Sequence, residues 1–128
     1  MDPISDMFIR IKNAQYAGHK TVSIPYSKFR YELVKTLERS GYIKDAERRG
    51  KRIKRFIEIE LKYEDKVSAI SGVRLLSRPS RRVFAHAKEL RSICRHGGVA
   101  VVSTSKGVMT HKEAMAAKIG GQLIAEIW

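Results

Sequence analysis

The chain has 128 residues and a formal net charge of +13, and its 43 % apolar content is enough for a hydrophobic core. A basic excess of this size is typical of polyanion-binding proteins, the alternative being a basic surface kept for solubility. A single cysteine excludes an internal disulfide, and no apolar run reaches the roughly 18 residues of a membrane span. The N-terminal residues lack the features of a signal peptide or a transit peptide, so we expect the chain to work in the compartment where it is made.

The first expected element is a helix that Asp2 caps, with Pro3 in its first turn and Gly18 as its stop. Apolar residues recur at helical spacing along it: Ile4, Met7, Phe8, Ile11 and Ala14. Arg10 and Asn13 fall away from the centre of this stripe, so they can face a partner.

The rest of the first half predicts a short strand over residues 21–24, a helix that Ser27 caps and Gly41 stops, and a hairpin. In the hairpin, residues 42–46 form one strand, residues 48–52 the turn and residues 53–63 the return strand. Ile53, Ile57, Ile59 and Leu61 share one parity in that return strand, which indicates one buried face. The order is α-β-α-β-β, and we place a domain boundary between residues 1–66 and 67–128.

The second half predicts strands over residues 72–77, 82–85, 99–102 and 123–128, with a short helix or turn at 87–93. Thr110 and Glu113 have the spacing of a capping box, so a short helix through Ala117 follows, with Gly120 and Gly121 as its stop. The fold class is therefore α+β, with two small halves and a mostly antiparallel C-terminal sheet.

Positive charge concentrates in two segments, residues 44–55 with a net charge of +5 and residues 74–96 with +6. The cations of the first segment either form a solvated hairpin tip or contact phosphates. In the second, Arg78 and Arg82 stand near Phe84, a pairing that suits RNA, where exposed bases stack on rings and guanidinium planes. We nevertheless expect Phe84 in the core, because phenylalanine is among the most buried residue types.

The segment from Ser103 to Thr110 is the most specific feature of the chain. Its small residues let the protein backbone approach an irregular RNA surface closely, and its hydroxyls can then form hydrogen bonds to ribose, phosphate and base edges. An ordinary capped loop is the simpler interpretation if the segment is taken alone. A nucleophilic role for Ser103 or Ser105 lacks the glycine-flanked elbow, and the four histidines are too scattered for a metal site, so we expect no catalysis, metal or cofactor.

Six stretches of the sequence closely resemble the bacterial ribosomal protein S8 family of the small subunit: DPISDMFIRIKNA, IPYSKFR, LERSGYI, LLSRPSRRVF, VAVVSTSKGVMTHKEA and GGQLIAEIW. The resemblance covers nearly the whole chain. It implies a non-enzymatic constituent of the small ribosomal subunit with two α+β halves. Such a protein binds the central domain of 16S ribosomal RNA early and helps assemble the platform of the 30S subunit.

The resemblance also implies a set of RNA-binding residues. Ser103, Thr104, Ser105 and Gly107 match the family's RNA-contacting loop, Arg10 and Asn13 its first helix, Ser27 and Lys28 the start of its second helix, and Arg78, Pro79, Arg82 and Phe84 its central strand region. Gln122 replaces the family's usual glutamate after the glycine pair, so it keeps an acceptor without the charge. Ser80, Phe84 and His96 also differ from the residues usual at their positions.

The resemblance further implies cytoplasmic ribosomes as the location, with an organelle-encoded origin left open, and small-subunit proteins five and twelve as neighbours. Binding to its own messenger RNA is a family-level possibility. Two other functions remain as alternatives: a DNA- or tRNA-binding module outside the ribosome, and a hydrolase that uses Ser103 or Ser105. Neither expected N-terminal helix is rich enough in arginine to read a major groove.

Overall fold

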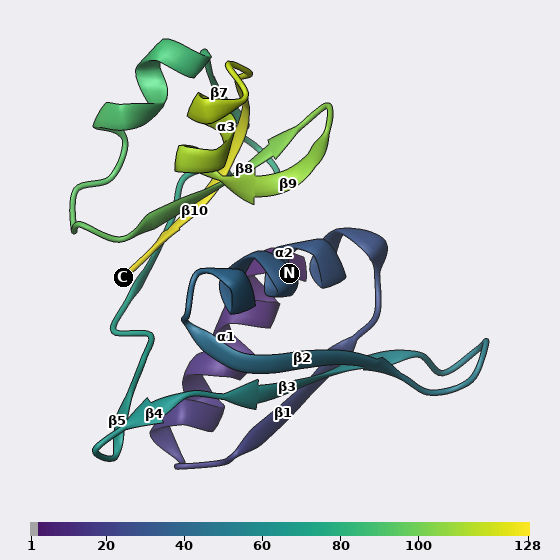
Figure 1. The fold of residues 1–128 in the computed structure, drawn as a ribbon. Helices are drawn as coiled ribbons and strands as arrows, with labels where there is room; N and C mark the ends of the chain where they lie inside the picture. The colour runs from purple at the N-terminus through teal and green to yellow at the C-terminus, as the bar shows by residue number, and fades with distance from the viewer. Residues whose placement is uncertain (1–2) are drawn as a thin grey trace. The chain divides into compact units, whose positions relative to one another are not determined.

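A computed structural model describes residues 3–128 and divides the chain into two compact units, Met1–Ile70 and Ser71–Trp128, which we call unit 1 and unit 2 (Figure 1). Every strand pair is antiparallel, and helices accompany the sheet of each unit. The expected α+β class is confirmed. The two-residue strands β4 (Tyr63–Glu64) and β5 (Val67–Ser68) pair with each other, so the expected boundary at residue 66 lies within their hairpin.

Unit 1 follows the expected α-β-α-β-β order before that hairpin. Its elements are α1 (Pro3–Tyr16), β1 (Thr21–Pro25), α2 (Lys28–Arg39), β2 (Ile43–Arg49) and β3 (Phe56–Leu61), and the sheet order is β1-β3-β2. Both helices lie on one side of this sheet (Figure 1). The largest fully buried side chains between the layers are Met7, Ile11, Ile24, Leu33, Leu37, Ile43, Ile57 and Ile59. The expected Asp2 cap lies outside the described residues.

The hairpin of unit 1 is longer than the sequence pattern indicates. Strand β2 continues through Arg48 and Arg49, and β3 begins only at Phe56. Ile53 was expected in the return strand, which is wrong: it lies in the turn and is 95 % exposed. The chain reverses late because Gly50 has a φ of +94° and the Lys54 N–H donates to the Lys51 carbonyl at 2.9 Å. The predicted inward parity holds from Ile57 onward.

Unit 2 is built on a sheet in which β10 is central. Its elements are β6 (Val73–Leu75), β7 (Val83–Ala85), the 3₁₀ helix η1 (Ala87–Ser92), β8 (Val99–Thr104), β9 (Gly107–Thr110), α3 (His111–Ala116) and β10 (Gly121–Ile127). The strand order is β6-β10-β8-β9, and β7 also pairs with β10. The core of this unit is a cluster of Leu90, Val102, Ala114 and Leu123, which come from η1, β8, α3 and β10.

Three expectations for unit 2 need correction. Ser103 and Thr104 belong to strand β8, and residues 107–110 form a strand of their own, so the expected loop is a tight hairpin. Helix α3 ends at Ala116, one residue earlier than expected, and Lys118 shortly after it takes a φ of +59°. Gly121 begins β10, and a Cβ there would lie 2.2 Å from the Ser103 carbonyl oxygen, so this glycine permits close strand approach instead of stopping the helix.

Two predicted helix caps are confirmed. Ser27 Oγ accepts from the Arg30 N–H at 3.1 Å and begins α2. Thr110 Oγ1 accepts from the Glu113 N–H at 3.1 Å, while a Glu113 carboxylate oxygen accepts from the Thr110 N–H at 3.0 Å. Among the described residues, no helix combines the length and the apolar character needed to cross a membrane.

Candidate nucleic-acid interface

A row of polar and aromatic side chains crosses one face of the unit 2 sheet. Gln122 of β10 is paired directly with Phe84 of β7 on one side and with Ser103 of β8 on the other. Side chains of directly paired antiparallel residues lie on the same face. The next pairs along, Leu123 with Val83 and with Val102, belong to the core, so the row of Phe84, Gln122 and Ser103 faces away from that core.

Phe84 is 68 % exposed, which overturns our expectation that it lies in the core. The reason is the pleat: β7 has only three residues, and its neighbours Val83 and Ala85 point to the core and leave Phe84 on the opposite face. An exposed ring beside an amide and a hydroxyl can stack on a base while its neighbours bond to base edges or ribose.

The β8–β9 hairpin presents its hydroxyls unequally. The Thr104 hydroxyl donates to the Gly107 carbonyl at 2.8 Å and accepts from the Lys106 N–H at 3.1 Å, so it shapes the turn. Gly107 has a φ of +112°, a conformation that a side chain would strain. Within residues 3–128, by contrast, the hydroxyls of Ser103 and Ser105 and the amide of Gln122 have no hydrogen-bond partner. These three groups are therefore available to a ligand.

Arginines surround a hollow of about 490 Å³ at the start of unit 2. Arg78 and Arg81 bracket a tight turn in which each backbone N–H donates to the other's carbonyl, at 2.9 and 3.0 Å. Arg74 and Arg95 line the same hollow, together with core residues such as Leu123. Arg78 thus belongs with other arginines and not with the row, whereas Arg82 is exposed immediately before β7.

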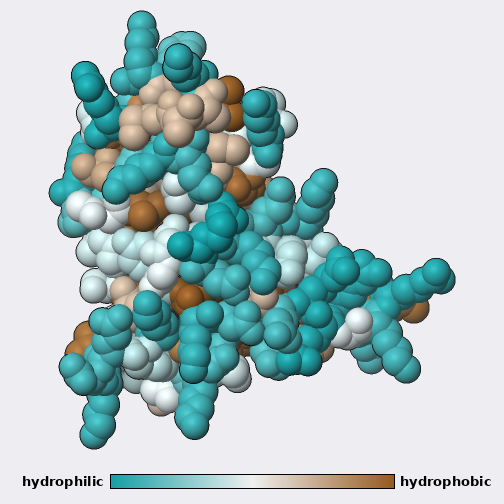
Figure 2. Space-filling view, viewed as in Figure 1, coloured by the Kyte–Doolittle hydropathy of each residue, from teal (hydrophilic) through white to brown (hydrophobic). Residues whose placement is uncertain are grey.

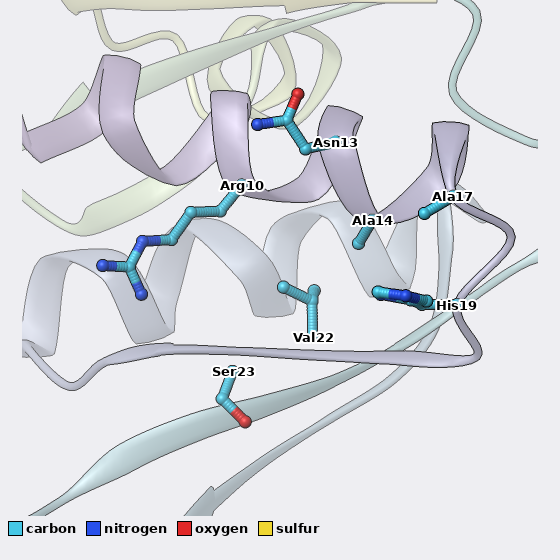
Figure 3. Close-up of a pocket in the computed structure, with 7 residues that line it drawn as sticks. All are labelled: Arg10, Asn13, Ala14, Ala17, His19, Val22 and Ser23. Carbon is cyan, nitrogen blue, oxygen red and sulfur yellow. The ribbon is translucent and has the colours of Figure 1, made fainter.

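Three of the four expected residues of unit 1 lie on its helices, and the fourth, Ser27, is the cap that precedes α2. Arg10 and Asn13 of α1 line a hollow of about 470 Å³ beside β1, where Figure 3 shows Arg10 extended toward the strand and the Asn13 amide directed away from it. Arg10 also pairs with Asp6 at 3.3 Å. The Ser27 hydroxyl is used by its cap, while Lys28 is exposed. The structure thus brings Arg10 and Asn13 together at one hollow, while Ser27 and Lys28 lie apart from that hollow at the start of α2.

Comparison with known proteins assigns the chain to a family. The family model "Ribosomal protein S8" matches residues 2–128. The chain belongs to the ribosomal protein S8 family. Relatives named small ribosomal subunit protein uS8 include those of Dictyoglomus turgidum and Mycoplasmopsis synoviae, which are 42 % and 43 % identical, each over 99 % of this chain and 97 % of the relative. The relative from Mycoplasma mobile is 39 % identical, over 99 % of this chain and 96 % of its own length.

The family assignment confirms the resemblance read from the sequence. Members of the family are structural ribosomal proteins of the small subunit and not enzymes, which agrees with the expectation that the chain has no catalytic role. Within the described residues, no group of three or more histidine, cysteine, aspartate or glutamate side chains is arranged to hold a metal ion.

Sequence reasoning missed a buried charge cluster around Glu126, which is 0 % exposed in β10. Its Oε1 accepts from Arg74 Nη2 at 2.9 Å and Nε at 3.2 Å, and its Oε2 accepts from the backbone N–H groups of Arg95 and His96 at 2.9 Å each. Burial alone would raise the pKa of this carboxyl, but the hydrogen bonds from His96, Arg74 and Arg95 outweigh it and lower the pKa of Glu126 to about 2. The feature of the sequence that could have indicated this cluster is a lone glutamate within an otherwise apolar strand.

The cluster fixes the loop before β8. The His96 ring stacks on the Trp128 ring with centroids 3.8 Å apart and planes at 10°. Two further residues missed in sequence lie nearby: Cys94 Sγ lies 3.7 Å from His111 Nε2, and His111 Nδ1 accepts from the Ala100 N–H at 3.1 Å. Burial raises the pKa of Cys94 and lowers that of His111.

Proposed function

We propose that the chain is a constituent of the small ribosomal subunit that binds the central domain of 16S ribosomal RNA directly and helps assemble the platform of the 30S subunit. The row of Phe84, Gln122 and Ser103 beside the Ser105 turn is the single observation that best supports this function. It combines an exposed ring with polar groups that have no partner within residues 3–128, on a face turned away from the core.

The chemistry of this surface suits folded RNA. Ribosomal RNA offers unstacked bases in loops and bulges, together with 2′-hydroxyls that both donate and accept. Phe84 supplies the stacking surface, the Gln122 amide donates and accepts at a base edge, and the hydroxyls of Ser103 and Ser105 bond to ribose or phosphate. Gly107 and Thr104 hold the hairpin in shape. Further residues contact the sugar–phosphate backbone of the RNA and position it without reading its sequence. These residues are Arg78, Arg82, Arg10, Asn13, Ser27 and Lys28.

Binding of the full chain to a central-domain transcript tests the recognition role of Ser105. Ser105→Ala removes one partnerless hydroxyl and should weaken binding to the cognate RNA about fivefold to tenfold, the size of a single hydrogen bond, with a smaller effect on unrelated RNA. Ser71→Ala, which also removes an exposed hydroxyl, should leave both affinities unchanged. An equal loss on the two RNAs for Ser105→Ala would contradict a recognition role.

Footprinting on intact small-subunit ribosomal RNA tests the location. Protection confined to the central domain supports the proposal, and protection elsewhere contradicts it. The proposal places the chain in cytoplasmic ribosomes, next to small-subunit proteins five and twelve, and crosslinking in assembled subunits measures this. The remaining expected partner is the messenger RNA of the chain itself, through a segment that imitates the binding site on the ribosomal RNA. Competition between that messenger RNA and the ribosomal RNA for binding to the chain tests this.

A further inference from the structure

The hairpin of unit 1 ends in a concentration of cations that the proposed function does not use. We call residues 48–55 the basic arm, since six of these eight residues are cationic: Arg48, Arg49, Lys51, Arg52, Lys54 and Arg55. All six are exposed. In Figure 1 the β2–β3 hairpin projects beyond both helices of its unit, and in Figure 2 its surface is mostly hydrophilic.

The arm differs from the neighbouring sheet in how its charge is compensated. Lys44 pairs with Glu60 at 3.4 Å, and Arg49 pairs with Glu47 at 2.7 Å and with Glu58 at 3.4 Å. The other five cations of the arm have no acidic partner in the described part of the chain. A surface kept for solubility usually mixes charges of both signs. Like charges this close repel one another, so the arm is arranged for an external polyanion.

The arm is also ordered. Arg48 from one strand and Arg55 from the other end of the turn lie over the Tyr26 ring, at 5.6 and 5.9 Å from its centroid. The Tyr26 N–H donates to the Arg55 carbonyl at 3.2 Å. At the tip, a Cβ on Gly50 would lie 2.2 Å from the Lys54 carbonyl oxygen, so the turn has one defined shape. Arg48 and Arg55 are therefore held in place before a ligand arrives, which reduces the entropy cost of binding through these two residues.

An apolar residue stands among these cations. Ile53 is 95 % exposed at the tip, where it gains nothing from contact with water. A two-stranded ribbon with cations at the end of one strand and through its turn, and with an apolar tip, can lie across a groove, with its cations on the phosphates and its tip against the sugars.

We propose that the basic arm is a second RNA-contact surface, which holds the phosphates of an RNA helix without reading its sequence. It rests on the proposed function only in taking RNA as the polyanion, and it is separate from the recognition row of unit 2. The row decides which RNA is preferred, and the arm adds affinity for any RNA helix.

The test measures how the affinity of the full chain depends on salt, with the central-domain transcript and with a hairpin of unrelated sequence. The arm variant replaces Lys51, Arg52 and Lys54 by glutamine. A charge-matched control replaces Lys66, Lys88 and Lys118, three exposed lysines scattered over the chain, by glutamine. Removing one cation that neutralises a phosphate lowers the steepness of log K against log salt by about 0.7 to 0.9.

The arm variant should bind both RNAs more weakly by the same factor, with the salt slope reduced by roughly 2 to 3, while the control changes it by less than about 1. Equal effects of the two variants would overturn the proposal, because net charge alone would then account for binding. An unchanged arm variant, or one weakened on the transcript alone, would also overturn it. The ratio of the affinities of the unaltered chain for the two RNAs measures its preference for the central-domain transcript. If the proposed function fails, the unaltered chain shows no such preference, and this outcome is independent of the effect of the arm variant.

Discussion

Glu126 shows how one ionised side chain can be tolerated in a core. Four N–H donors and a guanidinium charge replace the water that the carboxylate loses. Because the folded-state pKa of about 2 lies below the ordinary value of 4.5, the carboxylate stabilises the folded chain at pH values above about 4.5, and this stabilisation disappears as the pH falls through 2. The full effect is about 3 kcal/mol.

Replacing Glu126 by glutamine should therefore lower the free energy of unfolding by about 2 to 3 kcal/mol at pH 7. The amide keeps the shape but sets an NH₂ group against existing donors. Urea unfolding of both proteins between pH 7 and pH 2 measures the difference, which should shrink below pH 4.5 and vanish near pH 2. A difference that stays constant with pH would show that packing, and not ionisation, accounts for the effect.

Single residues were predictable where local pattern decides their environment. The caps at Ser27 and Thr110 depend on neighbours three residues away, and both are confirmed. Phe84 was misplaced because the average burial of a residue type ignores which way a pleat points, and Ile53 was misplaced because alternation along the sequence does not mark where the turn ends. The unused hydroxyls of Ser103 and Ser105, as against the occupied one of Thr104, follow from turn geometry that composition does not contain.

At the scale of elements, α3 is the one most dependent on its cap. It has six residues, too few for a helix to persist without tertiary contacts, and Ala114 carries it into the core. Thr110→Ala should therefore destabilise the protein by about 1 to 2 kcal/mol in urea unfolding. Thr110→Ser keeps the hydroxyl acceptor and should retain most of that stability, so equal destabilisation by the two variants would assign the effect to the missing methyl group.

The elements themselves were mostly predictable, since alternation and helical spacing mark them in sequence. Their ends were less so. The β2–β3 hairpin turns at residues 50–55 because Gly50 takes a positive φ there, and β9 was missed because its four residues show little alternation. Pairing across the sheet was beyond reach: β7 and β10 meet through residues 84 and 122, and nothing local to either strand specifies that pairing.

At the scale of the whole molecule, charge governs association with RNA. A net charge of +13 predicts binding by counterion release, with log K falling by about 0.7 to 0.9 for every unit of log salt and every phosphate neutralised. Titrating the unaltered chain with the central-domain transcript at increasing salt should give a steep straight line. Affinity that stayed flat from low to moderate salt would contradict the electrostatic account.

The stacked pair of His96 and Trp128 has a practical consequence. Trp128 is the sole tryptophan and lies in unit 2, while all five tyrosines, at positions 16, 26, 31, 42 and 63, lie in unit 1. The chain thus carries its own spectroscopic reporters, one for each unit. Indole emission reports the unfolding of unit 2, which holds the row of Phe84, Gln122 and Ser103, and tyrosine emission reports the unfolding of unit 1, which holds the basic arm. The order in which the two units unfold can therefore be measured without attaching a dye.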